Sequence, residues 1–407
     1  MTRTLWIVSG GAEAVPGIRR AKEMGLHVVV SDGDPEAPGL AWADDPVVAS
    51  TYDVQATLSA AKEYHHKRRP IDGVLTIAAD VPGTVASLAA ELGLPGIPVE
   101  TADLGSDKLA MKRRLAAAGI PLPWFAPIPS PEQLKSVIGE RGLPLVIKPV
   151  DSRGARGVLK LTRGVSLDWA FRHARRCSPS SRVMVEEYLE GPQISTESVL
   201  LDGLASTPGF SDRNYKDLDP SVPFLVENGG HQPSALNDEE RLAVAGLAER
   251  AALALGIRTG TAKGDMVLTA KGPMVIEIAP RLSGGWFATD QIPLATGVDL
   301  VGIAIRLALG ESVSPPELRP QFRQAVAIRY FFPPPGRVTA VGNVARFTGL
   351  DWIHRIGLFV KPGGIVEPLT DHTRRAGFVI ATGATTREAI RRAVGVTRQI
   401  TIKTVPR

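Results

Sequence analysis

The most informative part of the sequence is a pair of short apolar runs, Lys263-Gly264-Asp265-Met266-Val267-Leu268 and Val275-Ile276-Glu277-Ile278-Ala279-Pro280-Arg281. Both runs have the length and composition of β-strands. Successive side chains of a strand point to opposite faces, so Lys263 and Asp265 share one face. If the two strands are antiparallel neighbours, Asp265 and Glu277 converge as oxygen ligands for Mg²⁺, which prefers carboxylates together with substrate phosphates.

The residues around this acidic pair support a site rather than two surface acids. The turn Lys271-Gly272-Pro273 is expected to join the strands, and Lys263 and Arg281 then flank the metal. There they could hold an oxyanion or a transferring phosphoryl group. The alternative is an acid on each of two solvent-facing strand edges, which the apolar neighbours on both sides of Glu277 disfavour.

Upstream, a lysine lies within the apolar strand Val146-Ile147-Lys148-Pro149-Val150, and Ser106-Asp107-Lys108-Leu109 opens a basic helix. Lysine is rarely buried unless it is paired. The alternative is an edge-strand lysine whose head reaches solvent along its stem. The loop Ser152-Arg153-Gly154-Ala155-Arg156-Gly157-Val158 follows at once, and consecutive amides in such a turn form an anion-binding nest. A plain hairpin loop is the alternative, but lysine and nest together predict a polyphosphate site.

The run Val183-Met184-Val185-Glu186-Glu187-Tyr188-Leu189 is a predicted strand that ends in two acids. It could be only a solvated strand end. If the strand lines a nucleotide cleft, Glu186 can accept a hydrogen bond from an adenine amino group. The backbone near Glu187 and Leu189 would then read the ring.

The first 100 residues alternate short strands with helices, which predicts a doubly wound parallel sheet. Asp32 and Asp80 follow strand ends, where such sheets bind ligands, although solvated loop acids are an equal alternative. A helix is expected over 101–118 and a connector over 119–131. From residue 143 onward strands dominate, which favours a mixed or antiparallel α+β arrangement. Two capped helices are expected, Asn237–Leu255 with a capping box to Glu240, and one that begins at Thr385 with Glu388.

Composition restricts the class of protein. The chain has 407 residues, a net charge of 47 − 42 = +5, and one cysteine, Cys177, which excludes an intrachain disulfide. No apolar run reaches the roughly 18 residues of a membrane span, and the first residues predict a strand and a glycine turn rather than a signal peptide. GxGxxG, GxxxxGK[ST], GxSxG and HExxH motifs are all missing. These features favour a cytoplasmic, multidomain α/β protein without a nucleic-acid or membrane partner.

In this order, the motifs resemble the ATP-grasp carboxylate ligases, and within them the L-amino acid ligase branch. The resemblance rests on Asp107-Lys108, Ile147-Lys148-Pro149, the loop 152–158, Glu186-Glu187-Tyr188-Leu189-x-Gly191, Asp265, and Glu277-x-x-x-Arg281. It implies a doubly wound domain over 1–100 and a small grasp lobe with its entry helix over 101–190. A large lobe with the metal site follows over 191–320, and a small carboxyl-terminal domain over 321–407.

The resemblance also implies roles for single residues. Lys108 and Lys148 would contact the α- and β-phosphates of ATP, and the loop 152–158 would close over the triphosphate. Asp265 and Glu277 would hold one or two Mg²⁺ ions, with Mn²⁺ as a substitute, and Lys263 or Arg281 would steady the phosphorylated carboxylate. The remaining nucleotide contacts implied by the resemblance are Ser152, Gly154, Gly157, Glu186, Glu187, Tyr188, Leu189 and, at the ribose, Gln193.

Two positions depart from the pattern of many relatives. Gln193 stands where many have glutamate, which keeps a hydrogen bond but no charge. Ala279 stands where many have asparagine as a third metal ligand, and alanine cannot coordinate a metal. Water could complete the shell, one metal could be lost, or another residue could substitute.

The substrate side is expected in two segments. In the loop 225–234, Glu227 could take an amine and His231 could orient or deprotonate it, although a loop histidine is more often a surface residue. In the segment 283–287, Ser283 and Gly284 could offer backbone amides to the acceptor, although a helix-entry turn is an equal interpretation.

The function expected from the resemblance is an ATP-dependent ligase that joins a carboxylate to an amine through an acyl phosphate. Both substrates would be small molecules, of amino acid or peptide type, and a homodimer is the family-level expectation. Two alternatives stay open. One is a carboxylase that uses bicarbonate through carboxyphosphate, and the other is a nucleotide-binding sensor without turnover, which Ala279 makes conceivable.

Overall fold

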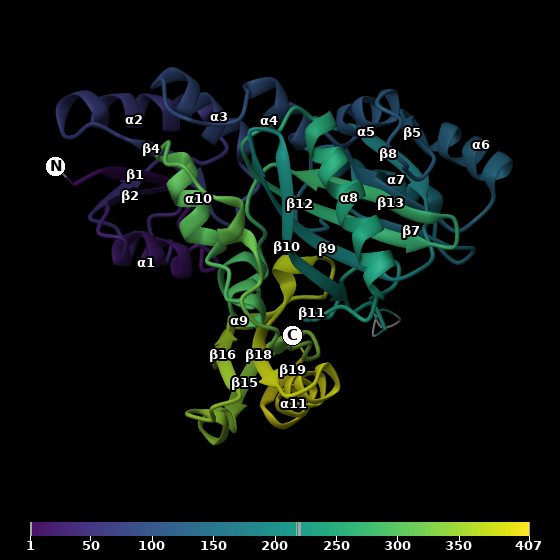
Figure 1. The fold of residues 1–407 in the computed structure, drawn as a ribbon. Helices are drawn as coiled ribbons and strands as arrows, with labels where there is room; N and C mark the ends of the chain where they lie inside the picture. The colour runs from purple at the N-terminus through teal and green to yellow at the C-terminus, as the bar shows by residue number, and fades with distance from the viewer. Residues whose placement is uncertain (1, 217, 219–220, 407) are drawn as a thin grey trace.

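The structure is a computed structural model that describes residues 2–216, 218 and 221–406. Within these residues the strands form four sheets (Figure 1). The first is the predicted parallel sheet, in the order β3-β2-β1-β4. Its strands are β1 (Thr4–Val8), β2 (His27–Asp32), β3 (Asp45–Val48) and β4 (Gly73–Thr76), and its helices are α1 (Val15–Glu23), α2 (Val54–Lys67) and α3 (Pro82–Glu91).

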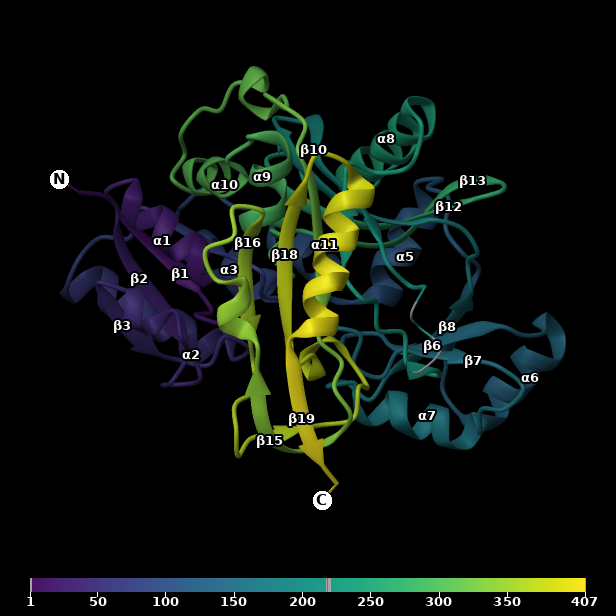
Figure 2. The ribbon, with the colours of Figure 1, turned by 90° about the horizontal axis from the view of Figure 1, so that it is seen from below.

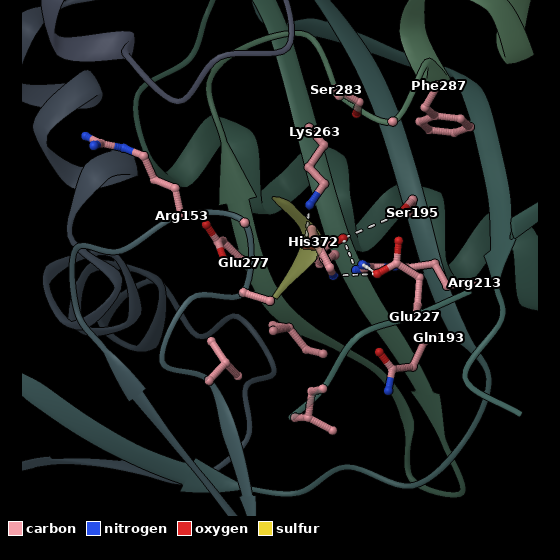
Figure 3. A pocket seen from close by; sticks show the side chains of 18 of the residues that line it. Arg153, Gln193, Ser195, Arg213, Glu227, Lys263, Glu277, Ser283, Phe287 and His372 are labelled. Atoms are coloured by element: carbon pink, nitrogen blue, oxygen red, sulfur yellow. Dashed lines mark hydrogen bonds and ion pairs between the residues drawn. The ribbon is translucent and has the colours of Figure 1, made fainter. Parts of the chain in front are cut away.

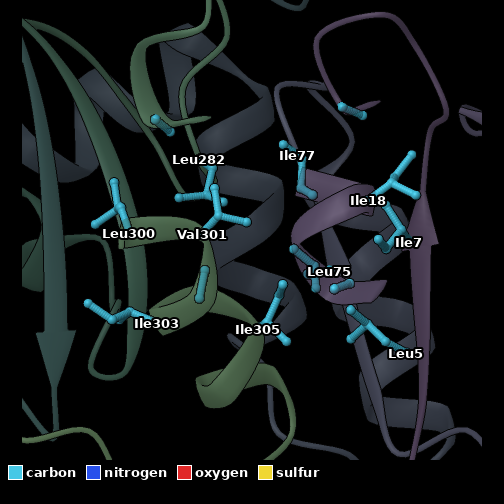
Figure 4. Close-up of a cluster of buried hydrophobic side chains, with 14 of the residues drawn as sticks. Leu5, Ile7, Ile18, Leu75, Ile77, Leu282, Leu300, Val301, Ile303 and Ile305 are labelled. Carbon is cyan, nitrogen blue, oxygen red and sulfur yellow. The ribbon is translucent and has the colours of Figure 1, made fainter. Parts of the chain in front are cut away.

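Both faces of this parallel sheet are covered, as expected for strands as apolar as Thr4–Val8. Trp6 and Val8 pack on one face against α2 and α3, while Leu5 and Ile7 pack on the other against α1. The second layer on that face is α10 (Leu300–Ala308), from nearly 300 residues further along the chain (Figure 4). The sequence pattern gave no sign of this helix.

The predicted helix over 101–118 is two helices in the structure, α4 (Val99–Ser106) and α5 (Lys108–Ala117). The break lies at Asp107, which has extended backbone angles and accepts hydrogen bonds from the amides of Leu109 and Ala110. An N-cap carboxylate satisfies backbone donors that have no partner inside the helix, so Asp107 starts a new helix. This places Lys108 in the first turn of α5.

The small lobe is an antiparallel sheet in the order β5-β8-β6-β7. The connector expected over 119–131 contains its edge strand β5, and α6 and β3 were also missed because neither has a strong periodic pattern. Strand β7 begins at Leu159, directly after the loop 152–158. The bounds are β5 (Phe125–Ile128), α6 (Pro131–Arg141), β6 (Leu145–Pro149), β7 (Leu159–Leu161), α7 (Leu167–Arg176) and β8 (Val183–Glu187).

The largest sheet has the order β13-β12-β9-β10-β11-β14-β18-β16, and its neighbouring strands pair antiparallel throughout the described residues. It continues across residue 320, and the domain boundary expected there stays a prediction. The turn between β12 and β13 is Ala270–Lys271, because Gly272 and Pro273 already pair with Thr269 and Leu268. Its strands are β9 (Gln193–Leu201), β10 (Leu204–Arg213), β11 (Gly230–Gln232), β12 (Gly260–Thr269), β13 (Gly272–Ala279), β14 (Ala325–Tyr330), β16 (Ile353–Leu358) and β18 (Gly377–Gly383).

Helices and a small ribbon of strands complete the chain. Both predicted caps are confirmed: Asn237 and Glu240 form a capping box, and Thr385 accepts from the amide of Glu388. Figure 2 shows α11 lying along β18, which it covers with alanine and valine side chains. The remaining bounds are α8 (Asp238–Ala254), α9 (Ile292–Thr296), α11 (Thr386–Gln399), β15 (Gly336–Gly342), β17 (Ile365–Val366) and β19 (Thr401–Val405). No described helix is both long and apolar enough to span a bilayer.

Candidate active site

A pocket of about 560 Å³ lies where the small lobe, the largest sheet, the amino-terminal sheet and the carboxyl-terminal segment meet (Figure 3). Most of the predicted site residues line it, although they come from separate elements. The predicted residues in its wall are Lys108, Lys148, Ser152, Gly154, Glu186, Glu187, Tyr188, Leu189, Gln193, Glu227, Lys263, Asp265, Glu277, Arg281, Ser283 and Gly284. Gly157 and His231 are outside it.

The acidic pair lies at the centre of the pocket. Strands β12 and β13 are antiparallel, and Asp265 pairs directly with Glu277 in the register. Asp265 contacts Lys263 and lies 2.9 Å from Nη1 of Arg213, while Glu277 lies 3.5 Å from Nζ of Lys108. Burial opposes the ionisation of Asp265, but Lys263 and Arg213 outweigh it and lower the pKa of Asp265 to about 2. Asp265 is therefore charged at neutral pH.

The donor set of this pair fits Mg²⁺. Two carboxylates face the same pocket, and Mg²⁺ is commonly held by one or two carboxylates together with substrate phosphates. Ala279 is buried and adds no donor, and among the described residues no group of three or more His, Cys, Asp or Glu side chains could hold a metal alone. The hydroxyl of Ser195, 3.5 Å from Asp265 Oδ1, is the nearest neutral oxygen ligand on the same wall.

Lys108, Lys148 and Glu186 line the end of the pocket where the sequence predicts the nucleotide, here called the nucleotide end, and the fully buried Lys112 contacts Glu186 from outside the pocket wall. Glu186 is buried on β8, where Lys148 contacts one carboxylate oxygen and Lys112 lies 3.0 Å from the other. Lys108 Nζ donates to the carbonyl of Ser152, 2.7 Å away. The sequence analysis missed Lys112, although it stands one helical turn after Lys108. Burial lowers the pKa of Lys112 to about 8, against the opposing charge of Glu186.

The loop 152–158 lies over this end. Its two glycines differ: Gly154 faces the pocket, whereas a Cβ on Gly157 would meet Cys177 and Pro149 at 2.7 and 2.8 Å. The predicted nucleotide contact at Gly157 is therefore replaced by a packing role. Arg153 lies over the ring of Tyr52, 4.4 Å from its centroid.

Arg281 joins the site to the amino-terminal sheet. Its Nε donates to Asp80 Oδ1, 2.6 Å away, and both side chains line the pocket. Burial disfavours the charge of each group, but the pairing raises the pKa of Arg281 and lowers that of Asp80. Of the two acids at strand ends, Asp80 therefore reaches the site, whereas Asp32 accepts from the amide of Gly10, after β1, and from that of Asp34 in its own turn.

Glu227 forms the substrate end with basic groups from three directions. It lies 3.0 Å from Nη2 of Arg213 on β10, 2.6 Å from Nε2 of His372, and it accepts hydrogen bonds from Arg375. Burial opposes its ionisation, but these three basic neighbours hold the pKa of Glu227 well below its usual range. The amine that the sequence analysis gave to Glu227 would meet a carboxylate that is already paired.

The predicted role of His231 is corrected by the geometry. On β11, alternate side chains point to opposite faces, and His231 points away from the pocket toward Asp212, 3.4 Å from its Oδ2. The histidine in the pocket wall is His372, from the turn before β18. No sequence pattern marked it, because only the tertiary fold brings residue 372 next to residue 227.

The segment 283–287 lines the pocket as expected, but two of its amides are already bound. The amide of Ser283 donates to the buried Glu197, 3.0 Å away, and that of Gly285 donates to Glu13, 2.7 Å away. Burial raises the pKa of both carboxyls, that of Glu197 to about 7. The sequence analysis singled out neither acid.

A pocket enclosed by two β-rich lobes, with lysines at one end and paired acids at its centre, defines the class of protein as one with a two-lobed nucleotide-dependent fold. Family models agree with that class along the chain. They match an ATP-grasp N-terminal domain over residues 18–96, an ATP-grasp domain over 105–285 and an L-amino acid ligase C-terminal domain 2 over 329–405. The chain belongs to the ATP-grasp superfamily and is L-amino acid ligase-like in its carboxyl-terminal domain.

Individual proteins show the same relationship. The chain is 28% identical to the uncharacterised protein y4rH of Sinorhizobium fredii over 92% of this chain and 76% of that protein. It is 29% identical to a D-alanine–D-alanine ligase of Marinobacter nauticus, over 44% of this chain and 54% of that ligase. The crystal structure of an L-amino acid ligase from Bacillus licheniformis has the same fold, with a TM-score of 0.83, 20% identity and 99% of both chains covered.

Proposed function

We propose that this protein is an ATP-dependent ligase that joins a carboxylate to an amine through an acyl phosphate and releases ADP and phosphate. The observation that carries the proposal is the direct pairing of Asp265 with Glu277 between cations from two lobes. Such a site suits phosphoryl transfer, which depends on positioning and on neutralising the charge of the phosphates rather than on a protein nucleophile.

The nucleotide end supports ATP as the phosphoryl donor. Lys108 and Lys148 would contact the phosphates, and the loop around Gly154 would cover them. Glu186 is engaged by two lysines in the ligand-free protein, so its carboxylate would orient Lys148 as well as accept from adenine. The backbone near Leu189 and the amide of Gln193 line the same wall, in reach of the base and the ribose.

Asp265 and Glu277 are the residues that would hold Mg²⁺. When bound, the ion would neutralise charge on the phosphates and polarise the phosphoryl group under attack. Lys263 and Arg213 contact Asp265, so both cations lie beside the residues that would hold the metal and would face the transferring group. Arg281, fixed by Asp80, would steady the acyl phosphate from the opposite side.

The substrate end supports an amino acid as the carboxylate donor. Among the described pocket carboxylates, Glu13 and the exposed Glu187 have no Lys, Arg or His partner, and only Glu13 lies at this end. An ammonium group would complete its pairing, and we place the α-ammonium of the first substrate there. Trp286, which stacks on Phe378, and Phe287 add apolar surface beside it.

A screen for phosphate release over paired carboxylic acids and amines tests the proposal, with Glu277→Ala as the inactive control. Release that requires both an acid and an amine is the expected result. Release with bicarbonate alone would support the carboxylase alternative instead. ATP binding without ADP formation across the whole panel would support a sensor and overturn the ligase assignment.

A further inference from the structure

His372 is the one histidine among the described residues of the pocket wall. It comes from the carboxyl-terminal part of the chain, and its main-chain amide donates to the carbonyl of Gly154, 3.0 Å away, in the loop over the nucleotide end. The side chain lies beside Glu227 and Arg213 (Figure 3). His372 is therefore fixed to both ends of the pocket at once.

The two nitrogens of the ring have different surroundings. Nε2 is buried and lies 2.6 Å from Oε2 of Glu227, which is an ion-pair contact without the angles of a hydrogen bond. Nδ1 makes no hydrogen bond to the part of the chain that the structure describes, and 24% of the side chain remains exposed toward the pocket. A carboxylate at one nitrogen fixes the tautomer with the proton on that nitrogen, which leaves the other as a proton acceptor.

The charged groups around the ring come from three elements: Glu227 from its loop, Arg213 from β10 and Arg375 from the segment of His372 itself. Asp371 directly precedes His372, but its carboxylate is turned away from the ring and accepts from Thr373. Burial is the largest influence and lowers the pKa of His372 below its usual value, and Glu227 opposes this only in part. The ring is neutral at pH 7, the state that a general base requires.

We propose that His372, held by Glu227, is the general base that accepts a proton from the amine nucleophile. The inference rests on the proposed ligase function. The amine nitrogen forms a bond to the acyl carbon, the bond from that carbon to the phosphate oxygen breaks, and phosphate leaves with the electron pair. The nitrogen gives its proton to Nδ1, and the resulting imidazolium is paired with the carboxylate of Glu227.

The position of His372 suits this step better than that of any other described pocket group. Arg213 contacts both Glu227 and the candidate metal ligand Asp265, so the His372–Glu227 pair is one side chain away from the site of phosphoryl transfer. Asp80, Asp265 and Glu277 are paired with cations, and Glu13 is bonded to Gly285. None of these acids offers an unpaired, neutral group beside Arg213 that could accept the proton of the amine.

Two nucleophiles separate a general base from a structural residue. With ATP, Mg²⁺ and a mixture of the twenty protein L-amino acids, the acyl phosphate can be trapped by hydroxylamine, which is unprotonated at pH 7.5 and needs no base to attack. Without hydroxylamine, the amino acids must attack through α-amino groups that are largely protonated. Hydroxamate is measured by its iron complex, and dipeptides by mass spectrometry.

We expect His372→Gln and His372→Asn to lose dipeptide formation by roughly 100-fold or more, while hydroxamate formation stays within about threefold of wild type. The dipeptide defect should shrink as the pH is raised toward 9.5, because the amines then lose their protons without help. The exposed His66→Gln is the matched control and should change neither product.

Equal losses of hydroxamate and dipeptide in a folded variant, or unchanged dipeptide formation, would overturn the inference. If both variants fail to fold, the wild-type pH profile decides. Ionisation of the amine alone gives the logarithm of the dipeptide rate a slope of one against pH, so a steeper limb below about pH 6.5 that is missing for hydroxamate supports the base, and a slope of one throughout excludes it. A wild-type protein that forms neither product shows instead that the ligase proposal has failed.

Discussion

The two ends of the pocket are built in different ways. At the nucleotide end, Lys108, Lys112, Lys148 and Glu186 come from α5 and from adjacent strands of one small sheet. At the substrate end, Glu227 is held by Arg213, His372 and Arg375, which lie on both sides of it in sequence and up to 148 residues away. The first end is a property of one lobe, whereas the second exists only when the whole chain is folded.

The two ends also differ in how far their charges are neutralised. Three lysines share Glu186 and Glu277 at the nucleotide end, which leaves excess positive charge that a polyphosphate would neutralise. At the substrate end the carboxylate is already saturated by its neighbours. We therefore expect the nucleotide end to tolerate changes of substrate, and the substrate end to decide specificity.

The largest effect should come from the acids that lie between the two ends. Glu277→Ala and Asp265→Ala should each lower ATP-dependent phosphate release by roughly 1000-fold, the scale of losing a preorganised group that stabilises charge in the transition state. Glu190→Ala, an exposed acid near the same lobe, is the control and should keep wild-type activity. A variant at either site with more than a tenth of wild-type activity would show that the pair holds no essential metal.

The nucleotide end can be tested by removing the charge of its buried acid, Glu186. Glu186→Gln leaves Lys112 and Lys148 buried without a full counter-charge, which should lower the free energy of unfolding by about 3–5 kcal/mol in urea titrations. Its neighbour Glu187 is exposed, and Glu187→Gln should change stability by less than about 0.5 kcal/mol. Similar values for the two variants would mean that the lysines reach solvent.

The buried carboxyl of Glu197, which accepts from the amide of Ser283 beside the substrate end, should affect how stability depends on pH. Burial raises the pKa of Glu197 from 4.5 to about 7, so the folded protein keeps a proton that the unfolded chain releases. Stability from this group is therefore greatest at low pH and falls as the pH rises from about 4.5 to about 7, by up to about 3 kcal/mol.

Glu197→Gln should remove that fall, and Glu190→Gln should not. The measurement is the difference in unfolding free energy between pH 5 and pH 7.5 for each variant and for wild type. An unchanged fall in Glu197→Gln would show that Glu197 is already ionised in the folded protein at pH 5.

The smallest effect concerns the loop over the nucleotide end. Both glycines of the loop have left-handed backbone, with φ of 60° at Gly154 and 75° at Gly157, so alanine strains both by about 1 kcal/mol. Gly157→Ala adds the clash with Cys177 and Pro149 and should cost about 1–3 kcal/mol more in thermal or urea unfolding. Equal costs at the two positions would contradict the packing role of Gly157.

The nucleotide end could be predicted well from the sequence because its signals are local. The lysine within β6 and the acids of β12 and β13 follow from short-range patterns, and the structure places these side chains in one pocket. The error in the helix predicted over 101–118 also has a local cause. Asp107 ends one helix and begins another because its side chain caps the second, and a composition pattern over 101–118 does not contain that geometry.

The sequence names Glu227 and the segment 283–287 at the substrate end, but their partners could not be predicted, since these side chains meet through pairings that no short window contains. His231 looked suitable and His372 did not, yet strand alternation turns the first away and the turn before β18 brings the second in. Glu197 matters because it accepts from the amide of Ser283, 86 residues away. Glu13 matters because it accepts from the amide of Gly285, 272 residues away.

The sequence by itself determined the classes of the main elements, the caps of two helices and the chemical groups of the nucleotide end, because hydrophobic periodicity and capping act over a few residues. Only the tertiary structure decided which histidine lines the pocket, which glycine of the loop 152–158 is required by packing, and that α10 covers the amino-terminal sheet. Those outcomes depend on contacts between distant segments, where burial and ion pairing are settled jointly by the whole chain.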